Sequence, residues 1–120
     1  MAAHRSHLEL GRLGERAALD RYRRQGFEPL ATNWRCRLGE LDLVVSDGRT
    51  VVFCEVKARR GSAFGGPFDA VHAVKQRKLR ALAQAFLIAE GLDPPAVRFD
   101  VASVLVRGTT VQVELFEDAF

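Results

Sequence analysis

Four charged side chains on two neighbouring segments have a spacing that suits metal chemistry. Asp42 follows Glu40 by two positions in GELDLVV, and Lys57 follows Glu55 by two positions in EVK. Alternate residues of a β-strand point to the same side, so each pair shares a face if both segments are strands. Mg²⁺ binds carboxylate oxygens, and a lysine beside them can meet an anionic oxygen or an attacking water. The pattern is compatible with a metal site and also with a solvated charged face.

Residues 39–60, which carry these charges, are expected to form a β-hairpin. The pair Asp47-Gly48 favours a tight type I′ turn, because both central positions of that turn need a positive φ. Counting outward from such a turn, Glu40 faces Glu55, and Asp42 lies diagonally beside Glu55. The opposite face of the hairpin is apolar and carries Leu41, Leu43, Val45, Val52, Cys54 and Val56. Like charges opposite one another destabilise a sheet unless a cation lies between them, which favours the metal site.

Length and composition predict a single domain over residues 1–120. The chain is 48% hydrophobic, which is enough for one packed core. Its net charge is +3 and its pI about 9.3, and three of its 15 acidic residues lie in the charged patch, which leaves the rest of the surface more basic and suited to a polyanion. We see no signal peptide and no apolar run that could cross a membrane, and therefore expect a cytoplasmic protein in which Cys36 and Cys54 are reduced.

Residues 6–25 are expected to form a helix that ends at Gly26. One candidate sheet-facing stripe comprises Leu8, Gly11, Glu15, Ala18, Leu19 and Tyr22. A competing stripe, equally supported by the pattern, comprises Leu10, Leu13 and Ala17. Glu15 faces the sheet only in the first stripe, where a buried carboxylate would need a partner. Gly11 and Gly14 each cost about 1 kcal/mol relative to Ala, and so indicate a close approach of the helix to another element or a ligand.

The remaining chain predicts one strand before the hairpin, and one helix and two strands after it. The predicted strands span residues 30–38, 96–106 and 110–116, and the predicted second helix spans residues 69–90. Asp69 is the expected N-cap of that helix, and Gly91 ends it. A glycine-rich loop at residues 60–67 borders the charged patch. The expected architecture is an α/β fold with helices packed on a mixed five-stranded sheet, in the order α-β-β-β-α-β-β.

Five short motifs make this chain resemble a known family. They are Asn33-Trp34-Arg35-Cys36-Arg37, Gly39-Glu40-Leu41-Asp42-Leu43, Glu55-Val56-Lys57, Phe64-Gly65-Gly66-Pro67 and Arg98-Phe99-Asp100-Val101. From about Gly11 to the last residue, the chain resembles the YraN family of small bacterial proteins. That family is similar to the PD-(D/E)XK nuclease superfamily, and in particular to archaeal Holliday junction resolvases. The resemblance implies a restriction-endonuclease-like fold with a divalent metal site.

The resemblance also implies roles for single residues. Asp42 matches the motif aspartate, Glu55 the second carboxylate and Lys57 the motif lysine. Glu15 matches a glutamate that resolvase-like members carry on the first helix, so the implied ligands of Mg²⁺ or Mn²⁺ are Asp42, Glu55 and Glu15. Gln76 matches a catalytic helix glutamine of some members, although the aromatic residue expected four positions later is absent. This departure sets Gln76 apart from the other four candidate catalytic residues.

We therefore expect a divalent-metal-dependent endonuclease that hydrolyses phosphodiester bonds of DNA, with branched or junction DNA as one substrate class. Two alternatives stay open: a nucleic-acid-binding module of the same fold without catalytic activity, and a structural protein whose hairpin charges are only solvated. The basic residues expected to contact phosphates are Arg35, Arg37, Arg59, Arg60, Lys75 and Arg77. The sequence does not distinguish DNA from RNA, or a monomer from a homodimer.

Overall fold

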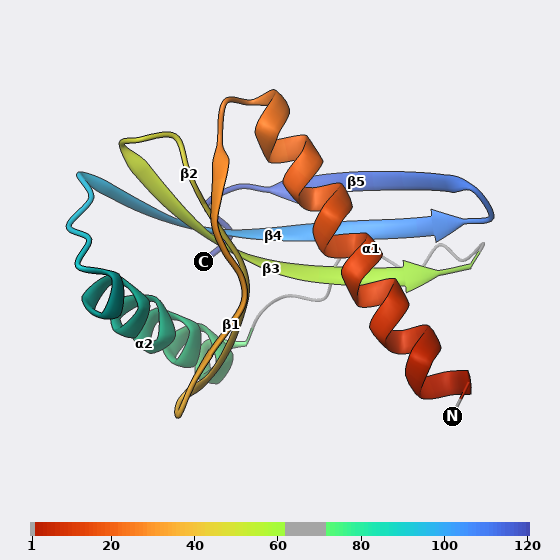
Figure 1. Ribbon diagram of the computed structural model, residues 1–120, viewed down its shortest axis with the longest axis horizontal. Helices are drawn as coiled ribbons and strands as arrows, with labels where there is room; N and C mark the ends of the chain where they lie inside the picture. Colours follow the sequence, from red (N-terminus) through yellow and green to blue (C-terminus); the bar gives the residue numbers. More distant parts are fainter. Residues whose placement is uncertain (1, 62–71) are drawn as a thin grey trace.

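The computed structural model describes residues 2–61 and 72–120. Helices and strands follow one another in the predicted order (Figure 1). They are α1 (Ala2–Arg24), β1 (Glu28–Cys36), β2 (Gly39–Ser46), β3 (Thr50–Arg60), α2 (Ala73–Glu90), β4 (Ala96–Arg107) and β5 (Thr110–Phe116). The predicted glycine-rich loop after Gly61 and the predicted N-cap Asp69 lie outside the described residues.

The strands form one mixed five-stranded sheet with the order β1-β2-β3-β4-β5. Neighbouring strands pair antiparallel, except β3 and β4, which run parallel along residues 50–60 and 96–106. A parallel pair needs a crossover connection, and α2 lies in the connection between β3 and β4. The predicted mixed sheet and the predicted order of elements are therefore confirmed (Figure 1).

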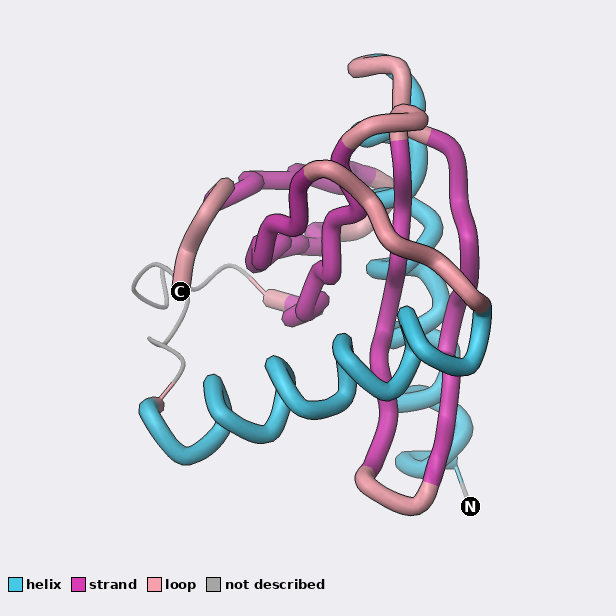
Figure 2. The backbone as a smooth tube through the Cα atoms, turned by 90° about the vertical axis from the view of Figure 1, so that its left-hand side faces the viewer, coloured by secondary structure: helices cyan, strands magenta, loops and turns pink. Residues whose placement is uncertain are grey.

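The two helices cover opposite faces of the sheet and build two hydrophobic clusters (Figure 2). The α1 cluster contains Ala18, Tyr22, Phe27, Leu43, Val45, Val52, Cys54 and Ala102. The α2 cluster contains Leu41, Val44, Val51, Phe53, Leu79, Leu82, Ala83, Phe86, Phe99 and Val101. Successive side chains of a strand point to opposite faces, which is why neighbouring residues of β3 enter different clusters.

The hairpin of β2 and β3 has a register that differs by two residues from the predicted one. Ser46 pairs with Val51, so the loop between the strands is longer than the predicted two-residue turn. The physical reason is Asp47, whose Oδ1 atom accepts the backbone N–H groups of Arg49 and Thr50 at 2.9 and 2.8 Å. These two hydrogen bonds stabilise an open loop in place of a type I′ turn. A shift of two residues nevertheless leaves the alternation of side chains unchanged.

Strands β2 and β3 separate beyond this short ladder and form what we call the sheet fork. The ladder joins residues 43–46 to residues 51–54, after which β2 continues beside β1, and β3 beside β4. Continued past the ladder, the observed register places Asp42 opposite Glu55, the position predicted for Glu40. Leu41 lies in the α2 cluster, and its predicted place on the apolar α1 face is wrong, because β2 turns toward α2 where it leaves β3.

Helix α1 lies directly on β3 where the two elements cross. A Cβ atom added at Gly14 would be 2.7 Å from the Cβ of Ala58 and 3.4 Å from a methyl carbon of Val56. Ala18 and Tyr22, one and two turns later, are fully buried against the sheet. The close approach predicted from the glycines is therefore confirmed at Gly14, and the stripe that contains Ala18 and Tyr22 is the sheet-facing one.

Two predicted element boundaries and the predicted burial of one residue differ from the structure. β1 ends at Cys36, and Leu38 lies in the following turn with 50% of its surface exposed, outside the predicted strand. α2 begins at Ala73 with His72 as its N-cap, four residues later than predicted. Leu8 belongs to the correct stripe but is 48% exposed, because the N-terminal part of α1 extends past the edge of the sheet (Figure 1).

A buried hydrogen-bond network joins α1 and the C-terminal segment to β4. Asp100 is fully buried, and its carboxylate accepts the Tyr22 hydroxyl at 2.6 Å and two guanidinium N–H groups of Arg98 at 2.9 and 2.8 Å. The backbone N–H of Asp118 donates to the same carboxylate at 3.0 Å. Burial raises the pKa of the Tyr22 phenol far above its ordinary value, so the phenol stays protonated and donates. These donors satisfy Asp100, which makes the network structural.

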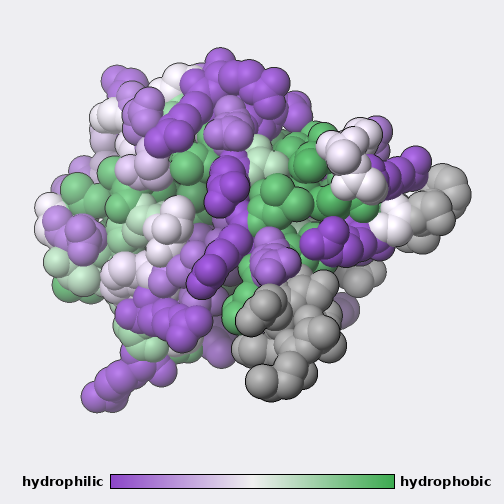
Figure 3. Space-filling view, turned by 45° about the vertical axis from the view of Figure 1, so that its right-hand side comes forward, coloured by the Kyte–Doolittle hydropathy of each residue, from purple (hydrophilic) through white to green (hydrophobic). Residues whose placement is uncertain are grey.

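The two cysteines lie at different depths, because Cys36 is half-buried and Cys54 is buried. Cys36 and Cys54 are both free, and burial raises the pKa of the Cys54 thiol far above its ordinary value. No helix in the described part of the chain has the length and apolar character needed to cross a membrane. Figure 3 shows one face of the molecule, on which hydrophilic residues run through the middle between patches of hydrophobic residues.

Candidate active site

Asp42 and Glu55 meet at the sheet fork. The Oδ2 atom of Asp42 accepts the backbone N–H of Val56 at 2.9 Å, so this carboxylate takes the place of a ladder partner where β2 leaves β3. The side chains of Asp42 and Glu55 also hydrogen-bond each other, which two carboxylates can do only if they share a proton. The observed register explains this contact, because it sets the two residues opposite one another.

The environment of Asp42 penalises its negative charge. Burial and, next, the charge of Glu55 raise the pKa of Asp42 to about 8, although the Val56 N–H acts in the opposite direction. Near neutral pH the cation-free pair therefore holds a proton. A site that is short of positive charge in this way suits a cation that binds oxygen ligands.

Glu15 approaches the fork from α1, on the other face of the sheet from α2. Its Oε1 atom accepts the side-chain amide of Asn33 at 2.9 Å, and the side chain is half-buried. Burial raises the pKa of Glu15, the Asn33 amide lowers it, and the negative charge of Glu40 raises it. Glu15 also adds to the upward shift of the Asp42 pKa, so the two carboxylates sense each other's charge.

Asn33 is a site residue that the sequence interpretation did not single out. It has a φ of 52° within β1, and so adopts the left-handed conformation that asparagine tolerates better than most residues. This geometry lets the amide reach Glu15 from the strand. An asparagine inside an otherwise regular strand pattern is the signal that could have identified it, because asparagine is depleted in strands.

Lysines approach the carboxylate pair from two elements. The Nζ atom of Lys75, in the first turn of α2, forms an ion pair with Oε2 of Glu55. Lys57 lies two residues after Glu55 on β3, so strand alternation places both on the same face, and it is half-buried. Gln76 follows Lys75 and is half-buried, and its backbone N–H donates to the carbonyl of His72 at 2.8 Å.

The arginines predicted to contact phosphates do not converge on one point. The Nε atom of Arg35 donates to Glu40 at 2.7 Å, which gives Glu40 a partner outside the carboxylate pair. Arg37 and Arg77 are exposed on the β1–β2 turn and on α2, and Arg59 is half-buried on β3.

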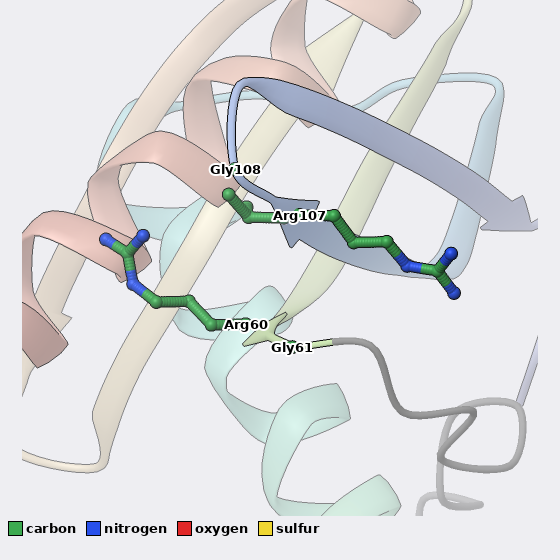
Figure 4. Close-up of a pocket in the computed structure, with 5 residues that line it drawn as sticks. Arg60, Gly61, Arg107 and Gly108 are labelled. Carbon is green, nitrogen blue, oxygen red and sulfur yellow. The ribbon is translucent and has the colours of Figure 1, made fainter.

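Arg60, the remaining arginine predicted to contact phosphate, lines a pocket of about 380 Å³ at the ends of β3 and β4. Gly61, Val106, Arg107 and Gly108 complete its lining. The side chains of Arg60 and Arg107 extend from the pocket in opposite directions (Figure 4). They therefore do not form a two-armed clamp for a single phosphate, and suit separate contacts along a backbone.

The donor set at the fork fits a hard divalent cation with few protein ligands. Within residues 2–61 and 72–120, no three His, Cys, Asp or Glu side chains are grouped closely enough to hold a metal ion together. Asp42 and Glu55 supply two carboxylates, the number with which Mg²⁺ is commonly held while it keeps several waters. Glu15 influences the pKa of Asp42 but is not grouped with the pair closely enough to complete a three-ligand set.

Comparison with known proteins places this site in a shared region. The model of an uncharacterised protein family, UPF0102, matches residues 14–104. A UPF0102 protein of Renibacterium salmoninarum is 45% identical over 102 residues, which cover 85% of this chain and 86% of the relative. A UPF0102 protein of Mycolicibacterium vanbaalenii is 46% identical over 88% of this chain and 88% of the relative. A UPF0102 protein of Syntrophotalea carbinolica is also 46% identical, over 94% of this chain and 92% of the relative. The matched region contains Glu15, Asp42, Glu55, Lys57 and Gln76.

Proposed function

The chain belongs to the uncharacterised family UPF0102, the YraN-like family that its motifs predict, and we propose that it is a divalent-metal-dependent endonuclease acting on DNA. The observation that carries this proposal is the carboxylate pair at the sheet fork. Asp42 and Glu55 come from different strands, contact each other and repel each other's charge, and Lys57 follows on the same strand face. Such a cluster lowers the stability of the folded protein, and a catalytic role in phosphodiester hydrolysis would explain why it is present.

In this proposal, Asp42 and Glu55 hold Mg²⁺ or Mn²⁺, and Glu15 takes part through a water. A cation bound there supplies positive charge that polarises the scissile phosphate and lowers the pKa of a water nucleophile. Lys57 orients the attacking water or neutralises the charge that develops on the phosphate. Asn33 keeps the Glu15 carboxylate turned toward the fork through its 2.9 Å hydrogen bond.

Exposed basic residues supply affinity for the nucleic acid backbone. Arg37 and Arg77 extend into solvent from the β1–β2 turn and from α2, on the two elements that flank the fork. Phosphate contacts of this kind do not read sequence and weaken as the salt concentration rises. They favour a substrate recognised by its backbone and its shape, and branched or junction DNA is one such class.

A second candidate function is a nucleic-acid-binding module of the same fold without catalytic activity. The ion pair of Lys75 with Glu55 supports it, because a lysine that neutralises the site permanently would leave no need for a cation. The absence of a grouped three-ligand set in the described residues is in line with it. The intact set of Glu15, Asp42, Glu55 and Lys57 favours catalysis over this alternative.

The test is cleavage of labelled linear duplex, single-stranded and four-way-junction DNA, each with Mg²⁺ and with Mn²⁺. We expect Asp42→Asn and Lys57→Ala to abolish cleavage, while affinity for DNA without metal stays within a few-fold of wild type. Asp42→Asn should also lose metal binding by calorimetry, because it removes a ligand charge. Asp93→Asn and Lys78→Ala, which change the same residue types at exposed positions, serve as matched controls.

The outcomes separate the candidate functions. Cleavage that disappears with Asp42→Asn and Lys57→Ala but survives in both controls supports the endonuclease. Salt-dependent binding by wild type without cleavage of any substrate supports the binding module. If wild type binds neither metal nor nucleic acid, both proposals fail, and the carboxylate pair is only a structural feature of the fork.

A further inference from the structure

Lys75 brings a positive charge to the carboxylate pair. Its ammonium group contacts Oε2 of Glu55, whose side chain is 11% exposed, while the Lys75 side chain itself is 50% exposed. Glu55 in turn hydrogen-bonds Asp42. One positive charge thus reaches two closely placed carboxyl groups from the solvent side of the fork.

The geometry of Lys75 suits a removable partner better than a permanent one. The side chain comes from the first turn of α2, and half of it is exposed to water. A lysine presents a compact charge on a flexible four-carbon stem, so its ammonium can leave one anion for another with little change in the backbone. Asp42, by contrast, is fixed by the backbone of Val56.

We propose that Lys75 is an exchangeable counter-ion, which neutralises Glu55 in the cation-free protein and moves to a backbone phosphate of the nucleic acid when a divalent cation occupies the carboxylate pair. The inference rests on the proposed function and adds a positioning residue to it. Lys75 and the cation compete for Glu55, so Lys75 weakens cation binding in the free protein. Once released beside the site, Lys75 strengthens binding of the polyanion, and cation and nucleic acid therefore bind cooperatively.

Neighbouring basic residues do not meet the same conditions. Lys57 lies on β3 two residues after Glu55 and is half-buried, whereas half of the Lys75 side chain is exposed. Lys78, one turn after Lys75, is exposed, and its stem lies beside Gly39, the first residue of β2; the Lys78 Cε is 3.1 Å from a Cβ added at that glycine. Lys78 therefore offers a matched control on the same helix.

The experiment compares Lys75→Met with Lys78→Met, because both substitutions keep an unbranched stem and remove one charge. Calorimetric titration with Mn²⁺ should show binding at least about fivefold tighter in Lys75→Met than in wild type, and within about twofold of wild type in Lys78→Met. With Ca²⁺ as a non-cleaving cation, addition of the cation should raise the DNA affinity of wild type more than that of Lys75→Met. Urea unfolding without cation should show Lys75→Met less stable than Lys78→Met, since it leaves Glu55 without its partner.

Each other outcome overturns the inference in a distinguishable way. Unchanged or weaker Mn²⁺ binding by Lys75→Met, in a wild type that binds Mn²⁺ and cleaves DNA, refutes the exchange and leaves the endonuclease standing. A wild type that binds no Mn²⁺, together with the loss of stability in Lys75→Met, makes Lys75 a permanent counter-ion and refutes the metal-dependent function as well. Equal stability of the two variants without cation shows that the ion pair with Glu55 does not form in solution, which also refutes the inference.

Discussion

Gly14→Ala should destabilise the protein, although alanine is the better helix former. The new Cβ atom would lie 2.7 Å from the Cβ of Ala58 and 3.4 Å from a methyl carbon of Val56, whereas carbon atoms in contact are normally about 3.5–4.0 Å apart. Ala58 belongs to the central strand β3, so its Cβ cannot rotate away. Overpacking of this kind costs roughly 1–3 kcal/mol, and the gain in helix propensity returns up to about 1 kcal/mol. The difference between these two terms is a net loss of about 1 kcal/mol.

Gly11→Ala provides the matched control on the same helix. No atom lies within 4 Å of a Cβ added at Gly11, so this substitution keeps the full gain in helix propensity, about 1 kcal/mol. The two variants should therefore differ by about 2 kcal/mol in the free energy of unfolding, with opposite signs relative to wild type. At this chain length, that difference corresponds to roughly 8 °C in Tm.

The assay is urea unfolding of wild type, Gly14→Ala, Gly11→Ala, Ala58→Gly and the double variant Gly14→Ala/Ala58→Gly. The double variant removes the clashing Cβ from the strand, so the two substitutions should couple favourably in a double-mutant cycle. A Gly14→Ala protein as stable as Gly11→Ala would refute the close crossing of α1 over β3. The same variant should also impair cleavage, because Glu15 is adjacent to Gly14 and moves with the displaced helix.

Three further predictions concern the charged groups. Without cation, the free energy of unfolding should fall as the pH rises from about 4 to about 8, because the folded protein keeps a proton on Asp42 that the unfolded chain releases. Urea unfolding at several pH values should show that Asp42→Asn flattens this pH dependence. The same substitution should raise the free energy of unfolding by about 2 kcal/mol at neutral pH. Tyr22→Phe leaves the ring in the core but removes the 2.6 Å bond to Asp100, and should cost about 1–2 kcal/mol in the same assay. Asn33→Gly keeps the positive φ but removes the amide that lowers the pKa of Glu15, so an NMR titration should show that pKa rising further.

The fold could be predicted because each element has a local signal. Strand periodicity and helix-ending glycines give the element order, and those signals do not depend on distant residues. The register of the hairpin could not be predicted in the same way. Asp47 can adopt a type I′ turn or accept backbone N–H groups from an open loop, and the structure uses the second option.

The geometry of the candidate site depends on tertiary features that have no local signal in the sequence. Asp42, Glu55 and Glu15 lie around the fork, and the contact of Asp42 with Glu55 depends on the two-residue shift. The place of Leu41 depends on β2 leaving β3, which is a tertiary event with no sequence period of its own. The ion pair of Lys75 with Glu55 depends on where α2 begins, and the structure starts that helix at Ala73.

The hydrogen bond from the Val56 amide to Asp42 gives the fork its own spectroscopic probe. This amide proton points at a carboxylate whose charge changes with protonation and with any cation that binds it. Its resonance in a heteronuclear NMR spectrum should therefore move when the site changes state, and a chain of 120 residues is small enough for full assignment. The same backbone signal could thus follow proton loss in a pH titration, cation binding in a metal titration and nucleic acid binding in a DNA titration, without a label on the ligand.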